Sequence, residues 1–121
     1  MNRRIVSSQL FALIGKIDGG VALVVEGKRD KEALELLGFG SSTVFVLNKK
    51  PLYAVAEEIA AGCKEAVILT DLDAEGKKLY GRLNAMLQHL GVKVDNSLRN
   101  FLYKNTKLRQ IEGIGNIIQQ E

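Results

Sequence analysis

Acidic side chains follow two apolar segments of the chain, and their types and positions suit chemistry at a metal ion. Glu26 comes directly after the apolar run 21–25, and Asp71 and Asp73 follow the run 66–70. Continuous apolar runs of this length are typical of strands buried on both faces of a parallel sheet. Ligands of such sheets bind outside the carboxyl ends of the strands, so the three carboxylates are expected at the binding edge.

Asp71 and Asp73 have the spacing of a pair that shares one cation. In extended backbone, side chains two residues apart point the same way, and aspartate offers short, ionised oxygen ligands. A helix needs only one acidic cap, and a second close carboxylate adds repulsion that a cation relieves. Gly76 then allows a tight turn into a helix, whose N-terminus favours phosphate. We therefore expect Asp71, Asp73 and Glu26 to form a pocket for a divalent metal.

The elements that position these residues alternate along the chain. Apolar runs predict strands at 21–25, 43–47, 66–70 and 92–94, and apolar positions with helical spacing predict helices between them. Asp30 is expected to be the N-cap of the first of these helices, and Pro51 to start the next. Strands separated by helices imply parallel pairing through right-handed crossovers. The predicted fold class is α/β, with a parallel sheet of about four strands and helices on both faces.

The length and composition predict one domain over residues 1–121. The chain is 46% hydrophobic and 26% charged, which suits a single sheet with its covering helices. The motifs occupy about 20–95, an amphipathic helix is expected at 2–17, and 96–121 form a C-terminal extension. Within the extension, the segment 101–103 is expected to be an edge strand and 108–120 a short closing helix.

Composition also restricts the location and the function. The formal charge of +3 favours polyanions mildly, so the placement of the charges matters more than their sum. Cys63 is the only cysteine, which excludes an internal disulfide and a cysteine-based zinc cluster and fits a reducing cytoplasm. No apolar run approaches the roughly 20 residues that cross a bilayer, so no membrane partner is expected.

Basic residues accompany the acids. Three pairs either follow a predicted strand or open a predicted helix, and in a parallel sheet they collect at one edge: Lys28 and Arg29, Lys49 and Lys50, Lys77 and Lys78. Any single lysine is ordinarily a solvated surface residue, whereas three pairs at one edge suit contacts with nucleic-acid phosphates. Arg99, Lys104, Lys107 and Arg109 add positive charge near Phe101 and Tyr103, and these aromatics either extend the track by stacking bases or, as is more common, belong to the core.

Of two other motifs, one is rejected on spacing and one is given little weight. The segment 71–76 imitates the start of a calcium loop, but the twelfth position holds Arg82 instead of a bidentate glutamate. The segment 113–115 is similar to the hairpin of some DNA-binding helix pairs, but few residues remain after it to form a second helix.

The combination of Glu26-Gly27 after one buried strand with Asp71-x-Asp73-x-x-Gly76 after a later one resembles the toprim domain. The similarity covers about residues 20–95, and the stretch 24–30, Val-Val-Glu-Gly-Lys-Arg-Asp, looks most like the ribonuclease that matures small ribosomal RNA. The chain's compact length is similar to that of stand-alone archaeal toprim proteins. Toprim domains also occur in topoisomerases, primases and OLD-type nucleases, and the resemblance implies a Rossmann-like toprim fold.

The resemblance also implies roles for single residues. Asp71 and Asp73 match the metal-binding pair, and Glu26 matches the acid that acts as general base or acid, or as a further metal ligand. Asp30 matches the second acid of the OLD-type nucleases, which helps hold another metal ion, and this metal-binding role competes with its capping role. The tyrosine nucleophile of topoisomerases belongs to a domain that this chain lacks, so topoisomerase activity is not expected.

Together these features predict a protein that acts on nucleic-acid phosphodiesters with Mg²⁺, or alternatively Mn²⁺. The leading hypothesis is a small nuclease acting on structured RNA or on DNA. The alternative is a non-catalytic, metal-assisted binding module within a larger ribonucleoprotein or DNA-repair assembly. A third interpretation, acids that only cap helices, predicts that all three carboxylates can be replaced without loss of ligand binding.

Overall fold

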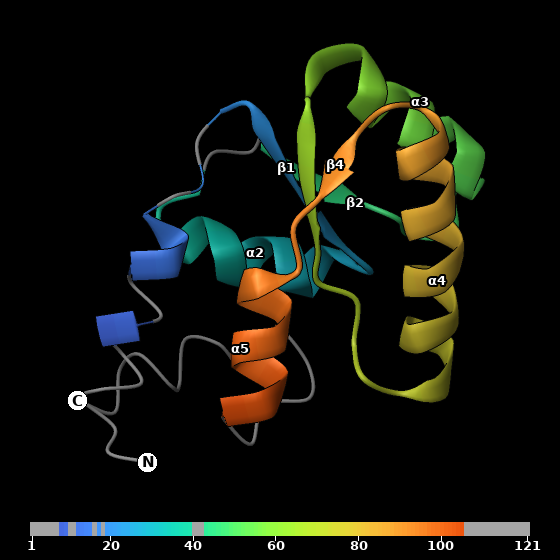
Figure 1. The fold of residues 1–121 in the computed structure, drawn as a ribbon. Helices are drawn as coiled ribbons and strands as arrows, with labels where there is room; N and C mark the ends of the chain where they lie inside the picture. Colours follow the sequence, from blue (N-terminus) through green and yellow to red (C-terminus); the bar gives the residue numbers. More distant parts are fainter. Residues whose placement is uncertain (1–7, 10–11, 16, 18, 40–42, 106–121) are drawn as a thin grey trace.

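The computed structural model describes residues 8–9, 12–15, 17, 19–39 and 43–105. Its elements alternate between strand and helix, as the sequence predicts (Figure 1): β1 (Val21–Val25), α2 (Lys28–Leu36), β2 (Val44–Val46), α3 (Leu52–Gly62), β3 (Glu65–Ile68), α4 (Ala74–His89), β4 (Lys93–Val94) and α5 (Ser97–Asn105). The four strands form one sheet in the order β2-β1-β3-β4, and every neighbouring pair is parallel. The predicted α/β fold class is therefore confirmed.

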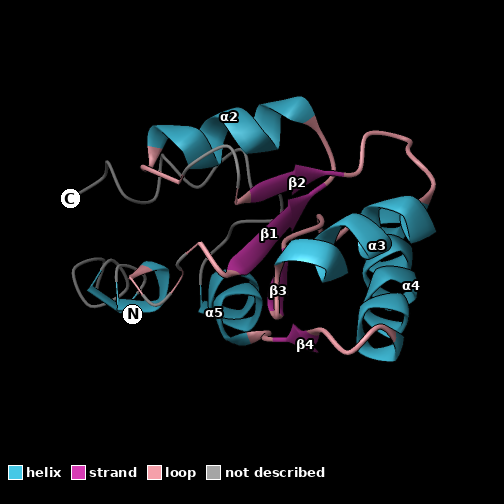
Figure 2. Ribbon diagram, turned by 90° about the horizontal axis from the view of Figure 1, so that it is seen from above, coloured by secondary structure: helices cyan, strands magenta, loops and turns pink. Residues whose placement is uncertain are grey.

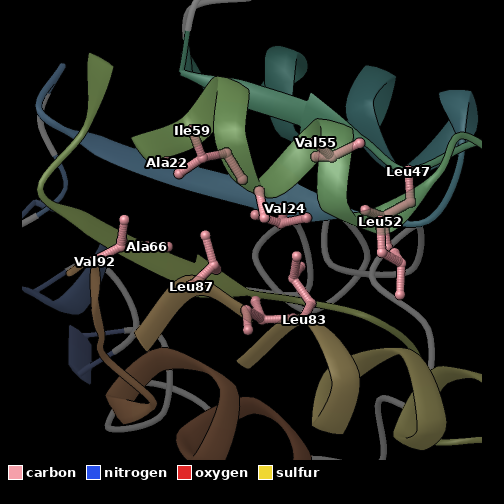
Figure 3. Close-up of a cluster of buried hydrophobic side chains, with 12 residues drawn as sticks. Ala22, Val24, Leu47, Leu52, Val55, Ile59, Ala66, Leu83, Leu87 and Val92 are labelled. Atoms are coloured by element: carbon pink, nitrogen blue, oxygen red, sulfur yellow. The ribbon is translucent and has the colours of Figure 1, made fainter. Parts of the chain in front are cut away.

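Helices cover both faces of the sheet, as Figure 2 shows from above. Side chains alternate between the faces of β1, so Leu23 and Val25 meet α2 and α5 while Ala22 and Val24 meet α3 and α4. All five residues of β1 are buried, which explains its uninterrupted apolar sequence. The layer beneath α3 and α4 contains twelve buried side chains, among them Ile59 and Leu83 (Figure 3).

The strand order places a topological switch point between β1 and β3. The chain leaves β1 through α2 to reach β2 on one side, and leaves β3 through α4 to reach β4 on the other side. The register aligns Val24 with Ile68, and the amide of Leu69 continues the pairing by donating to the carbonyl oxygen of Val24 over 2.7 Å. The residues after β1 and β3 therefore emerge together, where open α/β sheets bind ligands.

The prediction for the C-terminal extension was wrong over 101–103. Phe101, Leu102 and Tyr103 lie in α5 and not in an edge strand. The spacing explains this, because Leu98 and Leu102 are four residues apart, are both buried, and pack on the sheet face that also carries α2. The predicted helix at 108–120, including the segment 113–115, lies outside the described residues.

Other boundaries differ by small amounts. Asp30 is not the N-cap of α2, because the helix begins at Lys28 and Gly27 occupies the cap position. Of the predicted helix at 2–17, residues 8–9 and 12–14 are helical and the remaining predicted positions are only partly described. Among the described helices, none combines the length and the apolar character needed to cross a membrane.

Candidate functional site

Glu26 and Asp71 form the centre of the site at the switch point. Glu26 is the first residue after β1, and Asp71 follows the extended residues after β3. The Oε1 atom of Glu26 and the Oδ1 atom of Asp71 are both buried, and with both carboxyls ionised neither accepts a hydrogen bond from a donor in the described part of the chain. Two acceptor oxygens close together without a donor repel each other unless a proton or a cation lies between them.

The surroundings of Glu26 favour its protonated form when no cation is bound. Burial raises the pKa of Glu26 to about 7 from the ordinary value of 4.5, and a hydrogen bond to Asp71 and the charges of Asp71, Asp73 and Asp30 act in the same direction. A protonated Glu26 can donate to Asp71, so the two carboxyl groups can share one proton. A carboxyl group that titrates near neutral pH is suited to moving protons in catalysis.

Asp73 lies at the start of α4 and has a capping role. Its Oδ1 accepts a hydrogen bond of 2.7 Å from the backbone N–H of Gly76, which makes Asp73 the N-cap of this helix. Its charge also raises the pKa of Glu26, so it lies within electrostatic range of the pair. Asp73 therefore has the ordinary capping role that the sequence argument weighed against metal binding, whereas Oδ1 of Asp71 accepts no hydrogen bond from a donor in the described part of the chain.

Gly76 is required for a reason that the sequence did not indicate. A Cβ atom at this position would lie 2.7 Å from the carbonyl carbon of Asp71 and 2.9 Å from its amide nitrogen. The backbone of Asp71 therefore packs directly on the first turn of α4. Only glycine permits that approach, which fixes the loop that carries Asp71 and Asp73.

Asp30 holds the turn between β1 and α2. It is 8% exposed, and its Oδ2 accepts a hydrogen bond of 3.0 Å from the backbone N–H of Gly27. In this capping box, the side chain of the third helical residue, Asp30, accepts a hydrogen bond from the backbone of the N-cap residue. Asp30 therefore has a structural role. Because its charge contributes to the raised pKa of Glu26, it also belongs to the acidic surroundings of the site.

A buried arginine from α5 supports the end of β3. Arg99 is 7% exposed, and its Nη1 donates hydrogen bonds of 3.1 Å to the carbonyl oxygen of Ile68 and 2.6 Å to that of Thr70. Its guanidinium lies over the rings of Tyr80 and Tyr103, at 4.7 and 5.1 Å from their centres. Arg99 therefore ties α5 and α4 to the strand end that leads into Asp71.

Thr70 links the same elements from the strand side. Its hydroxyl donates to the carbonyl oxygen of Gly76 over 2.7 Å, and its own carbonyl oxygen also accepts a hydrogen bond of 3.1 Å from the hydroxyl of Tyr103. Burial lowers the pKa of Arg99, while the charges of Tyr103, Tyr80, Asp71 and Glu26 act against that shift. The guanidinium stays charged, and this buried cation interacts electrostatically with both Asp71 and Glu26.

Sequence reasoning missed this support. It offered Arg99 as part of a nucleic-acid track and left Tyr103 open between that track and the core. In the structure Arg99 is buried, and Tyr103 is partly buried against Thr70. The available signal was the helical spacing of Leu98 and Leu102, which places Arg99 next to the buried side of α5. No feature of the sequence indicated that its partner would be the end of β3.

An open groove of about 570 Å³ adjoins Glu26. One side comes from the β1–α2 turn with Glu26 and Asp30, and the other from α4 with Leu79 and Arg82. The loop before α3 closes the groove and contributes, among others, Asn48, Lys49 and Lys50. The structure thus brings together four of the predicted site residues in one groove: Glu26, Asp30, Lys49 and Lys50.

The other predicted basic residues lie at the same sheet edge but do not line this groove. Lys28 and Arg29 are exposed in the first turn of α2, and Lys77 and Lys78 are exposed in the first turn of α4. The groove and these two helix ends all follow the carboxyl ends of strands. The three basic pairs therefore lie at the same end of the sheet as the acid pair, but only Lys49 and Lys50 line the groove.

The described residues do not form a complete metal cage. In that part of the chain, no group of three or more histidine, cysteine, aspartate or glutamate side chains is arranged to hold a metal ion. Glu26 and Asp71 offer two carboxyl groups within hydrogen-bonding reach of each other. Mg²⁺ is commonly held by one or two carboxylates, with waters and phosphate oxygens completing the shell. The unpartnered oxygens fit such a cation.

Comparison with known proteins places the chain among archaeal relatives. It is 38% identical over 95 residues to a UPF0292 protein of Methanocaldococcus jannaschii, an alignment that covers 76% of this chain and 73% of the relative. A UPF0292 protein of Pyrococcus abyssi is 41% identical over 106 residues, covering 85% of this chain and 76% of the relative. The chain belongs to the UPF0292 family.

The UPF0292 relatives extend to more distant archaea, and one solved structure shares the fold. The UPF0292 protein of Thermoplasma volcanium is 30% identical over 95 residues and is covered over 80% of its length. A solved structure of a protein from Aquifex aeolicus matches with a TM-score of 0.77 and 28% identity, covering 87% of this chain and 94% of that one. No family model matches the chain.

Proposed function

We propose that this protein is a Mg²⁺-dependent nuclease that acts on phosphodiester bonds of structured RNA or of DNA. The observation that carries the proposal is the pair of buried carboxylate oxygens, Glu26 Oε1 and Asp71 Oδ1, which lack donors at the switch point of the sheet. A ligand-binding edge with two such oxygens suits a divalent cation bound to an anionic substrate.

The roles of the residues follow from their positions. Glu26 and Asp71 would hold the cation, with Asp73 and Asp30 adding negative charge nearby. A bound Mg²⁺ supplies charge neutralisation and orientation of a phosphodiester. Glu26 is placed to accept or donate the proton, because its surroundings keep its pKa near neutral.

The basic pairs supply contacts for the substrate backbone. Lys49 and Lys50 line the groove beside Glu26, and the pairs in the first turns of α2 and α4 are exposed at the same edge. Lysine contacts to phosphates position a nucleic acid without reading its sequence. The resemblance to the toprim domain supports the same function, since toprim enzymes use these acids on phosphodiesters. We further propose that the protein acts in the cytoplasm, where its substrates are found.

Cleavage assays with matched variants test the proposal. Labelled single-stranded, duplex and hairpin substrates should be cut with Mg²⁺ or Mn²⁺ and left intact with EDTA. Glu26→Gln and Asp71→Asn should lower the cleavage rate by about a thousandfold or more, the order expected when metal and proton transfer are both impaired. Glu35→Gln, an exposed acid on α2, should cleave like the wild type.

A second candidate is a non-catalytic, metal-assisted nucleic-acid-binding module within a ribonucleoprotein or DNA-repair assembly. The observation that favours it is that two converging carboxylates can hold one cation, whereas hydrolysis by two metals needs a larger ligand set. Binding that persists in all variants, with no turnover of any substrate in Mg²⁺ or Mn²⁺, would support the module and contradict the nuclease.

A further inference from the structure

The groove beside Glu26 has the dimensions and walls of a small-ligand site. Its volume of about 570 Å³ falls within the range of about 300–1,000 Å³ that is typical of pockets for small organic ligands. The side chains of Leu47, Leu52 and Leu79 give it an apolar part. Leu47 and Leu52 belong to the buried layer under α3 and α4, so this part of the groove is supported from below (Figure 3).

Acidic and basic side chains both line the groove. Glu26 and Asp30 come from the β1–α2 turn, and the loop before α3 contributes Lys49 and Lys50. Helix α4 contributes one acid, Glu75, in its first turn and one base, Arg82, two turns later. These three cations are exposed, so they can reach an anionic group without losing a partner in the core. A ligand that fits this lining has an apolar body and an anionic group that reaches Lys49, Lys50 and Arg82.

The loop that carries the lysines is held in a defined conformation. Asn48 and Lys49 have φ angles of 38° and 63°, in the left-handed region that residues other than glycine adopt at some cost. The amide of Asn48 donates to the carbonyl oxygen of Glu26 over 2.8 Å, and that of Leu47 donates to Val25 over 2.9 Å. The position of the lysines is therefore coupled to the backbone of Glu26.

We propose that this groove binds one unpaired nucleotide of a single strand, with its base against the apolar part. One adjoining phosphate would contact Lys49, Lys50 and Arg82. The other phosphate would lie near Glu26 and Asp71 only when a cation is bound there, so binding in EDTA depends on the base and on the first phosphate. This inference rests on the proposed action on phosphodiesters and specifies the substrate: the nucleotide at the cleavage point is single-stranded.

A paired nucleotide does not fit the same arrangement. A base within a duplex is stacked and hydrogen-bonded, so moving it into the groove costs a few kcal/mol, whereas an unpaired base avoids most of that cost. Phosphate contacts alone would give the opposite preference, because a duplex presents twice as many phosphates as either of its strands. The comparison of single strand with duplex therefore separates base binding from simple charge attraction.

Fluorescence anisotropy with the whole protein in EDTA tests the proposal. The probes are a labelled 12-nucleotide oligothymidylate, the same strand in a 12-base-pair duplex, and a 12-unit strand in which every base is replaced by an abasic sugar. We expect the oligothymidylate to bind about tenfold more tightly than the abasic strand, as loss of one buried apolar group predicts. It should also bind more tightly than the duplex. Equal affinity for the abasic strand, or tighter binding of the duplex, would overturn the proposal.

Variants of exposed residues locate the binding to the groove. Lys50→Ala and Arg82→Ala should each weaken binding of the oligothymidylate about three- to tenfold and lower the slope of log K against log salt by about 0.7. Lys64→Ala, an exposed lysine just before β3 at the opposite sheet edge, is the matched control and should bind like the wild type. Equal losses in all three variants would place the nucleic acid elsewhere.

The two proposals fail separately. Binding in EDTA requires neither a cation nor cleavage, so a single-strand preference without any turnover leaves the groove assignment in place and removes the nuclease. Cleavage that depends on Mg²⁺, Glu26 and Asp71, but proceeds equally on fully paired substrate, retains the nuclease and removes the groove assignment.

Discussion

The carboxyl pair of Glu26 and Asp71 determines how the site responds to pH and to cations. Both side chains follow strands at the switch point, and each has a buried oxygen without a donor. The pair is most easily accommodated with one proton or one cation between its oxygens. Replacing one acid by its amide supplies a donor in place of the proton, so the consequences can be measured without any substrate.

The protein should become less stable as pH rises, because Glu26 loses its proton. Its pKa rises from 4.5 to about 7 on folding, so the folded state binds more protons than the unfolded state between these values. The free energy of unfolding should therefore fall as pH rises from 4.5 to 7, and the loss should be complete above that window. Urea unfolding at pH 5 and pH 8 in EDTA measures this.

Glu26→Gln should flatten that pH dependence, because the amide does not titrate. The variant should be more stable than the wild type at pH 8, since it lacks the buried charge repulsion. Glu35→Gln is the control and should retain the wild-type dependence on pH. An unchanged slope in Glu26→Gln would show that the carboxyl pair does not control the effect.

Mg²⁺ should raise the melting temperature at pH 8 if the pair binds the cation. Ligand at about ten times its dissociation constant stabilises a folded protein by about 1.4 kcal/mol, which corresponds to several degrees in a domain of this size. The shift should vanish in Asp71→Asn and Glu26→Gln. Without Mg²⁺, the free energy of unfolding of Asp73→Ala should be about 1 kcal/mol below that of the wild type, because the cap of α4 is lost, whereas Asp73→Asn should keep the cap. Equal shifts in the wild type and Asp71→Asn would contradict the assignment.

At the scale of elements, the site depends on contacts between the first turn of α4, the end of β3 and α5. Gly76 lets the Asp71 backbone pack on α4, and Arg99 bonds the carbonyl oxygens at the end of β3. Neither residue contacts the groove. Both should therefore affect the site through the position of the loop that carries Asp71 and Asp73.

Two glycines of the same helix give opposite predictions. Gly76→Ala places a Cβ against the Asp71 backbone and should lower the free energy of unfolding by about 2–3 kcal/mol. Gly81→Ala meets nothing within 4 Å on an exposed part of α4 and should raise it by about 0.5–1 kcal/mol. Urea denaturation of both variants provides the comparison. A similar effect of both would mean that the loop adjusts freely.

Arg99 should be needed for stability and not only for charge. Arg99→Leu removes the donor to Ile68 and Thr70 and should cost about 2–4 kcal/mol, because buried carbonyl oxygens lose a charged partner. Arg99→Lys should recover only part of this, since an ammonium lacks the planar fork that lies over Tyr80 and Tyr103. Exposed Arg82→Leu is the control. Full recovery by lysine would contradict a geometric role.

At the scale of the whole molecule, the positions of the charges should matter more than their sum. The double variant Lys49→Glu/Lys50→Glu and the double variant Lys64→Glu/Lys93→Glu change the net charge equally, at opposite edges of the sheet. Only the first should abolish binding of single-stranded nucleic acid at about 0.1 M salt, where charges more than about 10 Å away are screened. Equal losses in an anisotropy titration would point to non-specific attraction.

The general fold could be predicted from the sequence because its signals are local. The apolar run of β1 and the helical spacing in α3 and α4 fixed the alternation, and the crossover rule then required parallel strands. The strand order β2-β1-β3-β4 was not predicted, because it depends on which faces the helices cover. That order determines that Glu26 and Asp71 emerge side by side.

The acids of the site could be predicted, but their supports could not. Asp73 and Asp30 satisfy backbone amides a few residues away, which their types suggest. Thr70, Arg99 and Tyr103 are joined by hydrogen bonds across about thirty positions of the chain, and no spacing rule reports such contacts. Because 101–103 were predicted to be a strand, Arg99 was not placed in a helix with Leu98 and Leu102, and its position beside the buried side of that helix was missed.

The contact of Arg99 with Thr70 has a consequence for synthesis on the ribosome. Thr70 and the acids around it are translated well before Arg99. The end of β3 in the nascent chain therefore lacks its hydrogen bonds to Arg99 and Tyr103 until α5 has left the exit tunnel. We expect ribosome-bound chains that stop before residue 99 to be protease-sensitive around 69–73, and chains with a C-terminal linker long enough to bring α5 out of the tunnel to resist cleavage there. Helix α5 thus controls when the end of β3 becomes ordered.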